Sequence, residues 1–324
     1  MFSRLPLLRQ IVCGAVWRTN LRAAGIVCVA TLLAPSLAHA CACGCGVFGV
    51  GTLPLLPSGT GGTAFFEYDF MDQNRNWNGT SETPSSANPD KDIRTSFFTA
   101  GVQYMFNDAW GVMAEVPYWD RSFRTTDEAT GNLVTFNHAA PGDIRLTGVY
   151  SGFSPDNSTG IIFGLKLPTG DSTYPGFDRD TEIGSGSTDT LLGAYHAGAL
   201  VPDNAWGWFV QGMWEHAVAE RGSYRPGDEF DAATGVAYAR GIVLRNAAIM
   251  PAVELVASER LRDSGSAADP QNSGYARLFI APGAELDFQA WKLYAAAEFP
   301  VYQHFNGDQL AARALFKVTI GYNF

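Results

Sequence analysis

Three cysteines occupy alternate positions in the run Cys-Ala-Cys-Gly-Cys-Gly that begins at Cys41. Thiolates this close together, separated by small residues, can bind a soft ion such as Cu(I) or Zn(II). In an oxidising compartment the same thiols can instead form one disulfide and leave one reactive cysteine. Lipid attachment at Cys41 is a third alternative, although the usual leucine three residues upstream is replaced by alanine. Cys41, Cys43 and Cys45 are therefore a candidate soft-metal site, and the sequence indicates no other cofactor.

The sequence lacks the residue pattern of a barrel hydrolase. A serine nucleophile needs a nearby histidine to activate its hydroxyl, and strand-based lipid hydrolases carry the pair as His-x-Ser. The residues two positions after the histidines are Ala, Gly, Val and Asn, for His138, His196, His216 and His304 respectively. We therefore expect no enzymatic activity.

The first forty residues have the features of an export signal. Four arginines and no acidic residue are followed by an apolar stretch over residues 23–37 and then by Ala38-His39-Ala40. This order of a basic region, a short apolar core and a small-x-small site is typical of a cleaved signal peptide. We expect cleavage after Ala40, with an uncleaved anchor as the alternative. Residues 1–40 are then the signal peptide, residues 41–60 a cysteine- and glycine-rich segment, and residues 61–324 the folded domain.

Charge excludes one class of partner. The chain has a formal net charge of −10, and loss of residues 1–40 would remove four arginines and make it four units more negative. Nucleic-acid binding depends on clusters of Lys and Arg that contact phosphates, and no such cluster is present. We expect no nucleic-acid partner.

Apolar residues take every second position over long stretches of residues 61–324. In residues 98–106 the even positions hold Phe, Ala, Val, Tyr and Phe, whereas the odd positions hold Thr, Gly, Gln and Met. Residues 293–301 repeat the pattern with Leu, Ala, Ala, Phe and Val on one face. A period of two predicts strands. Runs of about ten residues favour membrane-spanning strands over those of a soluble sandwich, which average about five or six.

The segments between these strands alternate in length. Short connections are expected at residues 107–109, 154–158, 201–205, 239–241 and 289–290. Long polar ones are expected at residues 74–92, 125–141, 169–183, 219–229, 258–273 and 306–310. Short periplasmic turns and long outer loops are the plan of outer-membrane barrels. We therefore predict an all-β protein, a closed antiparallel transmembrane β-barrel of about twelve strands in the outer membrane.

Aromatic residues are expected in two belts at the membrane interfaces. The belt near the short turns contains Trp206, Trp208, Trp291, Tyr104, Phe106 and Phe288, and the other contains Tyr68, Phe70, Tyr118, Trp119, Trp214 and Tyr302. The last strand alternates to the final residue, and its Tyr322 and Phe324 resemble the C-terminal signature that the barrel assembly machinery recognises. That machinery, outer-membrane lipid and lipopolysaccharide are the expected partners.

Alternation also predicts which side chains face the lumen. The predicted set is Glu67, Asp69, Gln103, Glu115, Asp143, Arg145, Lys166, Glu215, Glu254, Arg277, Glu298 and Lys317. These charges can line a pore that selects solutes. Alternatively, they can form cross-strand ion pairs that fill a narrow barrel and close it.

Two prolines follow lumen-facing glutamates, in Glu115-Val116-Pro117 and Glu298-Phe299-Pro300. Proline removes a donor from the strand ladder, so each site predicts a bulge or local kink.

Three short motifs resemble a family of outer-membrane transporters grouped under the meta-pathway of phenol degradation. They are Gly142-Asp143-Ile144-Arg145-Leu146, Gly164-Leu165-Lys166-Leu167-Pro168-Thr169-Gly170 and Gly184-Ser185-Gly186-Ser187-Thr188-Asp189. The resemblance implies a channel or transporter for a small, hydrophobic or aromatic molecule. The cysteine-rich segment is not part of that pattern. A metal-handling barrel that uses Cys41–Cys45, and a closed barrel that acts as scaffold or adhesin, therefore remain as alternatives.

Overall fold

The computed structural model describes residues 59–127 and 129–324. The regular secondary structure in this part of the chain is made of strands and one 3-10 turn at Ser85–Ala87. The strands are β1 (Gly61–Gly79), β2 (Ser81–Glu82), β3 (Asp90–Met105), β4 (Trp110–Thr126), β5 (Leu133–Pro141), β6 (Ile144–Tyr150), β7 (Thr159–Leu167), β8 (Ser187–Ala199), β9 (Gly207–Glu220), β10 (Glu229–Ala237), β11 (Ile242–Leu244), β12 (Ala247–Arg260), β13 (Tyr275–Phe288) and β14 (Trp291–Asn323). None of the helical segments within these residues is long and apolar enough to cross a membrane.

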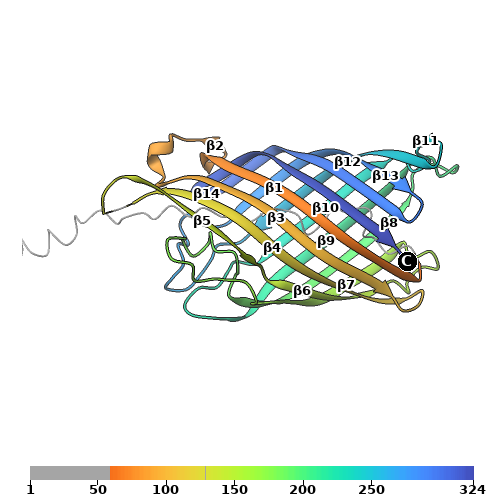
Figure 1. Ribbon diagram of the computed structural model, residues 1–324, viewed down its shortest axis with the longest axis horizontal. Coiled ribbons are helices and arrows are strands. Elements are labelled where there is room, and N and C mark those ends of the chain that lie inside the picture. The colour runs from red at the N-terminus through yellow and green to blue at the C-terminus, as the bar shows by residue number, and fades with distance from the viewer. Residues whose placement is uncertain (1–58, 128) are drawn as a thin grey trace, which may run out of the picture. The chain divides into compact units, whose positions relative to one another are not determined.

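The strands form one antiparallel sheet that closes on itself (Figure 1). Its order is β10-β9-β8-β7-β6-β4-β3-β1-β14-β13-β12, and β12 pairs with β10 to complete the ring. A closed ring of antiparallel strands needs an even number of passes, and β14 supplies two of them. It pairs with β13 from Trp291 to Phe305 and with β1 from Phe305 to Asn323, turning at Gly307. The ring therefore has twelve passes within the described residues, as the sequence predicts.

Alternation separates the two faces of the wall. In the last pass Phe316 and Ile320 are 47% and 42% exposed, whereas Lys317 and Thr319 between them are 2% and 1% exposed. Outward apolar and inward polar side chains are the pattern of a barrel surrounded by lipid. Phe324 lies on the outer surface at the end of this pass, and its backbone NH bonds to the Gly62 carbonyl at 2.8 Å.

Two segments predicted as long loops are largely strand. Residues 74–79 continue β1, and most of the segment 125–141 forms β5, which pairs with the end of β4. These strands extend past the others at the end of the barrel that carries the long loops (Figure 1). Polar residues such as Asn74 and Thr135 stand there, because beyond the lipid neither face of a strand has to be apolar. The alternation of apolar and polar residues is therefore lost there, although the strand continues. At the other end, the predicted turn at 239–241 is lengthened by β11, which pairs with β12.

The two prolines act differently. In β14, Pro300 pairs with Phe279 and Tyr302 with Leu278, so Val301 has no partner and forms the predicted bulge. At Pro117 no bulge forms against β3. Instead β4 changes neighbour there, from β6 at Glu115 to β5 at Tyr118. The Pro117 carbonyl accepts a hydrogen bond of 2.9 Å from the Gly142 NH, at the step between β5 and β6.

Candidate functional site

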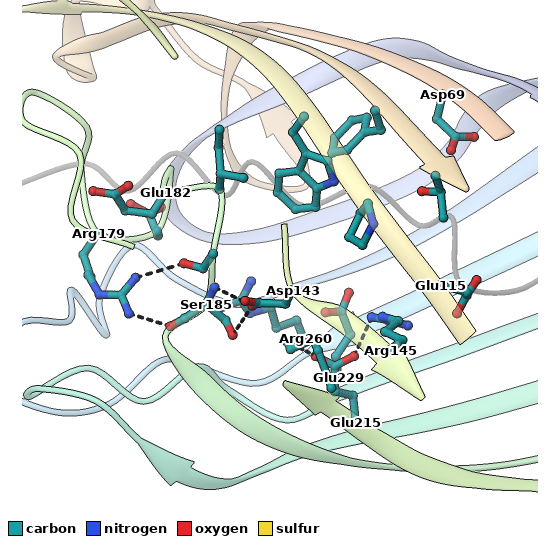
Figure 2. Close-up of a pocket in the computed structure, with 18 of the residues that line it drawn as sticks. Asp69, Glu115, Asp143, Arg145, Arg179, Glu182, Ser185, Glu215, Glu229 and Arg260 are labelled. Carbon is teal, nitrogen blue, oxygen red and sulfur yellow. Dashed lines mark hydrogen bonds and ion pairs between the residues drawn. The ribbon is translucent and has the colours of Figure 1, made fainter. Parts of the chain in front are cut away.

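The segment between β7 and β8, residues 168–186, folds into the barrel, and we call it the inner loop. Its residues Ile183, Gly184 and Ser185 line a cavity together with Glu67 of β1 and Glu215 of β9. These two strands lie far apart in the order of the ring. A loop that shares one cavity with both must lie inside the wall, and Figure 2 shows this part of the chain at the pocket.

Asp143 holds both ends of the inner loop. One carboxylate oxygen accepts a hydrogen bond from the Gly170 NH at 2.9 Å. The other accepts two from Ser185, from the NH at 2.7 Å and from Oγ at 2.6 Å (Figure 2). Hydrogen bonds to an ionised carboxylate are roughly twice as strong as neutral ones. Asp143 therefore acts as a latch that closes the loop on itself and ties it to the wall.

Close packing of two glycines reinforces the latch. A Cβ on Gly184 would lie 2.4 Å from the carbonyl carbon of Gly170, and one on Gly170 would lie 2.7 Å from the Gly184 Cα. Only glycine allows the backbone to pass this closely. Thr169 joins the same contact, since its Oγ1 accepts from the Ile144 NH at 2.9 Å. The three motifs found in the sequence thus meet at one point of the structure.

Aromatic packing fixes the outer part of the loop. Phe177 packs edge-on against Phe123 of β4, with ring centroids 5.8 Å apart. Tyr174 stacks on His138 of β5 at 3.8 Å, and Asp171 lies 3.0 Å from the ring nitrogen of that histidine. These contacts place the loop in a packed position against β4 and β5 rather than in open solvent.

A buried arginine holds the part of the inner loop that faces the cavity. Arg121 is fully buried, and its Nε donates to Thr95 Oγ1 at 2.9 Å. Its terminal nitrogen donates to the carbonyl oxygens of Thr181 and Glu182, the latter at 3.3 Å. The guanidinium also lies 5.0 Å from the ring centroid of Trp119. Backbone carbonyls near the tip of the loop are therefore satisfied by a cation from the wall.

The cavity has a volume of about 190 Å³ and a strongly charged lining. Eight carboxylates face it, from Glu67, Asp69, Glu115, Asp143, Asp180, Glu182, Glu215 and Glu229. Four cations face it, from Arg145, Lys166, Arg179 and Arg260. The remaining wall includes the apolar or aromatic residues Phe97, Pro117, Trp119, Ile183 and Tyr224.

Glu215 links two of the cations on neighbouring strands. Its carboxylate accepts from Arg145 at 2.6 Å and from Lys166, which also lies 2.5 Å from Asp189. Because two carboxylates offset two cations here, this part of the lining is close to neutral. The ion pairs hold β6, β7, β8 and β9 together beneath the inner loop.

A second charged group lies deeper, around Lys317. Its Nζ is 3.7 Å from a carboxylate oxygen of Glu67, which also accepts from Thr319 at 2.8 Å. Glu254 accepts from the Tyr294 hydroxyl at 2.6 Å. At the short-turn end a separate cavity of about 280 Å³ is lined mainly by small and aromatic residues, with the ion pair of Lys292 and Glu285 at 2.8 Å.

The twelve residues predicted to face the lumen fall into two groups. Seven line the main cavity: Glu67, Asp69, Glu115, Asp143, Arg145, Lys166 and Glu215. The other five are buried but do not line it: Gln103, Glu254, Arg277, Glu298 and Lys317. The roles of all twelve in solute selection stay predictions.

One aromatic residue is placed differently from its prediction. Trp119, expected in the outer belt, lines the cavity and packs edge-on against Phe97 at 4.8 Å. Trp119 is an even number of residues from Glu115 and Pro117 and therefore points to the same, inward face of β4. The prediction followed its aromatic character instead of this spacing. Residues of the inner loop, such as Arg179, Glu182 and Ser185, were not predicted as site residues, because a loop has no periodicity that marks its inward face. The only feature of the sequence that could have indicated these residues is their position in or beside one of the three motifs.

The candidate metal site, Cys41, Cys43 and Cys45, lies outside the described residues, as does the predicted signal peptide. Within residues 59–127 and 129–324, no group of three or more His, Cys, Asp or Glu side chains is arranged to hold a metal ion.

Glu182 makes the stability of the inner loop depend on pH. Burial, with a smaller contribution from nearby Asp171, raises the pKa of its carboxyl from 4.5 to about 7. Since the folded pKa exceeds the unfolded one, the folded loop holds a proton that the unfolded chain releases between these values. The resulting stabilisation is complete below pH 4.5 and is lost as the pH rises through about 7.

We therefore expect the inner loop to be better protected in acid. Amide hydrogen exchange in peptides from residues 168–186, corrected for intrinsic rates, should be slower at about pH 5 than at about pH 8. Glu182→Gln should remove this difference because the amide does not titrate, and peptides from β13 serve as the internal control. Equal pH dependence in the wild type and the variant would contradict the assignment to Glu182.

Comparison with known proteins supports the fold. No protein-family model matches the chain, and no curated protein matches it in sequence. It is similar to the crystal structure of an outer membrane channel from Pseudomonas putida F1, with 14% identity and a TM-score of 0.61, over 83% of this chain and 97% of that chain. The β domain of the Bordetella autotransporter BrkA has 12% identity and a TM-score of 0.47, over 82% and 100%. The CymD monoaromatic hydrocarbon channel has 9% identity and a TM-score of 0.41, over 89% and 98%. At these identities the first similarity shows a shared outer-membrane barrel fold.

Proposed function

We propose that this chain is an outer-membrane channel for small molecules, in which the inner loop narrows the lumen. The observation that carries the proposal is the cavity of about 190 Å³, which is lined from one side by the wall and from the other by the latched loop. A barrel that served only as a scaffold would need neither a loop tied inside it nor such a chamber. The similarity to a solved outer-membrane channel agrees with this proposal.

The proposal includes the route to the membrane. Residues 1–40 direct export and are removed, and the terminal strand with Tyr322 and Phe324 is recognised by the barrel assembly machinery. The outward apolar face then contacts lipid, and the outer loops contact lipopolysaccharide. The short turns lie in the periplasm.

Planar-bilayer recording tests the function. The mature protein, refolded in detergent and inserted at low density, should produce discrete current steps with brief closures, because the latched loop leaves a narrow lumen. Refolded protein is identified by its altered gel mobility without heating, which provides the control for folding. Absence of current steps from folded, inserted protein would favour the alternative of a closed scaffold or adhesin barrel, filled by ion pairs such as those of Glu215.

The cysteine segment supports a second candidate function, capture of a soft metal ion. If the thiolates of Cys41, Cys43 and Cys45 bind copper or zinc, the mature protein should carry metal that Cys43→Ser loses. Elemental analysis of both proteins after identical exposure and desalting measures this. Equal, negligible metal in both would remove the metal-handling alternative and leave the channel proposal unaffected.

A further inference from the structure

We infer that the cavity beneath the inner loop selects small organic cations, such as a protonated amine attached to a single ring. The inference rests on the proposed channel function and names the class of solute that the lining fits. It is carried by three observations: the balance of charges in the lining, two buried carboxylate oxygens that lack hydrogen-bond partners, and the volume of the cavity with its apolar surface.

The charge balance favours a cation because the protein's own cations are already engaged. Arg145 and Lys166 are paired with Glu215, and Arg260 lies 2.8 Å from Asp263. Arg179 donates to the carbonyl oxygen of Ser185 and lies over the ring of Tyr224 at 4.3 Å. The carboxylates of the lining outnumber these cations by eight to four.

Asp69, Glu115 and Glu182 are among the lining carboxylates that form no salt bridge within the described residues. They stand at different sides of the chamber. Figure 2 shows Glu182 near Arg179, on the side of the inner loop, and Asp69 and Glu115 on the opposite side. A solute inside the cavity therefore meets carboxyl groups from both directions.

Two buried oxygens in this lining lack a hydrogen-bond partner. Asp69 is 1% exposed and its Oδ1 accepts no hydrogen bond, and Glu182 is 8% exposed and its Oε2 accepts none. Buried polar atoms are nearly always satisfied by protein, water or ligand. An ammonium group presents three donors and no acceptor, so it complements oxygens of this kind. An anionic or purely apolar solute would leave them unsatisfied.

Size and apolar surface define the rest of the solute. A cavity of 150 Å³ lined by apolar residues holds a benzene molecule, so about 190 Å³ accommodates one ring with a short side chain. Phe97, Pro117, Trp119 and Ile183 supply apolar surface for that ring. The same wall disfavours a small hydrated metal ion, which gains nothing from aromatic contact.

Ion selectivity of single channels tests the inference with three probes, of which benzylammonium and benzoate are matched in size. Reversal potentials measured against chloride should show benzylammonium to be roughly fivefold or more permeant, and benzoate to be less permeant than chloride. Ammonium serves as the probe without a ring, and its preference over chloride should be weaker because it lacks contact with the apolar wall.

Two variants locate the selectivity. At about pH 8, where Glu182 is largely ionised, Glu115→Gln and Glu182→Gln should each lower the benzylammonium-to-chloride ratio about two- to threefold, since each removes one charge from the lining. Glu259→Gln is the matched control, because this glutamate is exposed on β12 and does not line the cavity. Gel mobility shows which variants have folded.

The outcomes separate the two proposals. Current steps that show no cation preference, or a preference for benzoate, would overturn the inference and leave the channel function intact. A cation preference that all three glutamine variants retain would show that selection occurs elsewhere, which also overturns it. The absence of any current from folded wild-type protein would overturn the channel function and the inference with it.

Discussion

Asp143→Ala is expected to raise the single-channel conductance about threefold or more, because it releases both ends of the inner loop. The wild-type carboxylate accepts three hydrogen bonds, from Gly170 and from the NH and Oγ of Ser185. Hydrogen bonds to a charged group contribute about 1.5–3 kcal/mol each. Alanine removes all three, so the two ends of the loop lose their attachment at Asp143 and spend more time away from the lumen axis.

Asparagine at the same position refines this prediction. Asp143→Asn keeps one carbonyl oxygen for the Gly170 NH, but its amide NH2 cannot accept from Ser185. An intermediate conductance with frequent transitions is therefore expected. Asp156→Ala, in the exposed short turn between β6 and β7, is the matched control and should behave as the wild type. Folded Asp143→Ala with unchanged conductance would show that the loop is not the barrier.

Glu215→Gln is expected to lower the free energy of unfolding by about 3 kcal/mol, since breaking a buried ion pair on one side leaves its cation uncompensated. In the wild type Arg145 and Lys166 both depend on this carboxylate; the side chains of Lys166 and Glu215 are largely buried, and that of Arg145 is partly buried. Neutral glutamine keeps the shape but leaves two positive charges with one remaining partner, Asp189. Urea unfolding in detergent micelles, followed by tryptophan fluorescence, measures the change.

Two further variants separate charge from packing. Glu220→Gln removes one partner of an exposed pair with Arg225, where the loss should stay within about 0.5 kcal/mol. The double variant Glu215→Gln with Lys166→Met should recover part of the lost stability, because it removes one of the uncompensated cations. A Glu215→Gln protein as stable as the wild type would contradict the role given to this ionic group.

The wall of the barrel could be predicted from the sequence because lipid imposes a strict pattern on it. Phe316 and Ile320 must face outward and Lys317 inward, and a period of two records this directly. The same period predicts twelve side chains that face the lumen, and seven of these line the main cavity. The alternation of apolar and polar residues no longer marks a strand where lipid contact ends, as at β5, which pairs with β4 although the sequence predicts a loop there.

The inner loop could not be predicted, because its position follows from contacts between residues distant in sequence. Asp143 and Ser185 are separated by 42 positions, and nothing in either segment alone indicates the other. The close approach of Gly170 and Gly184 is likewise visible only when both are placed in space. Trp119 differs in another way: its place in the period of two indicates an inward side chain, whereas its aromatic character favours the membrane interface.

Reversible locking of the inner loop tests the central claim most directly. Asp143→Cys and Ser185→Cys, introduced together after Cys41, Cys43 and Cys45 are changed to serine, can be joined by a short bifunctional thiol reagent that a reductant cleaves. The wild-type side chains are in contact at these positions, with 2.6 Å between Asp143 Oδ2 and Ser185 Oγ. We predict low conductance in the linked protein and an increase of about threefold in the same channel on reduction. Equal conductance before and after reduction, or none in either state, would contradict a conduit narrowed by this loop.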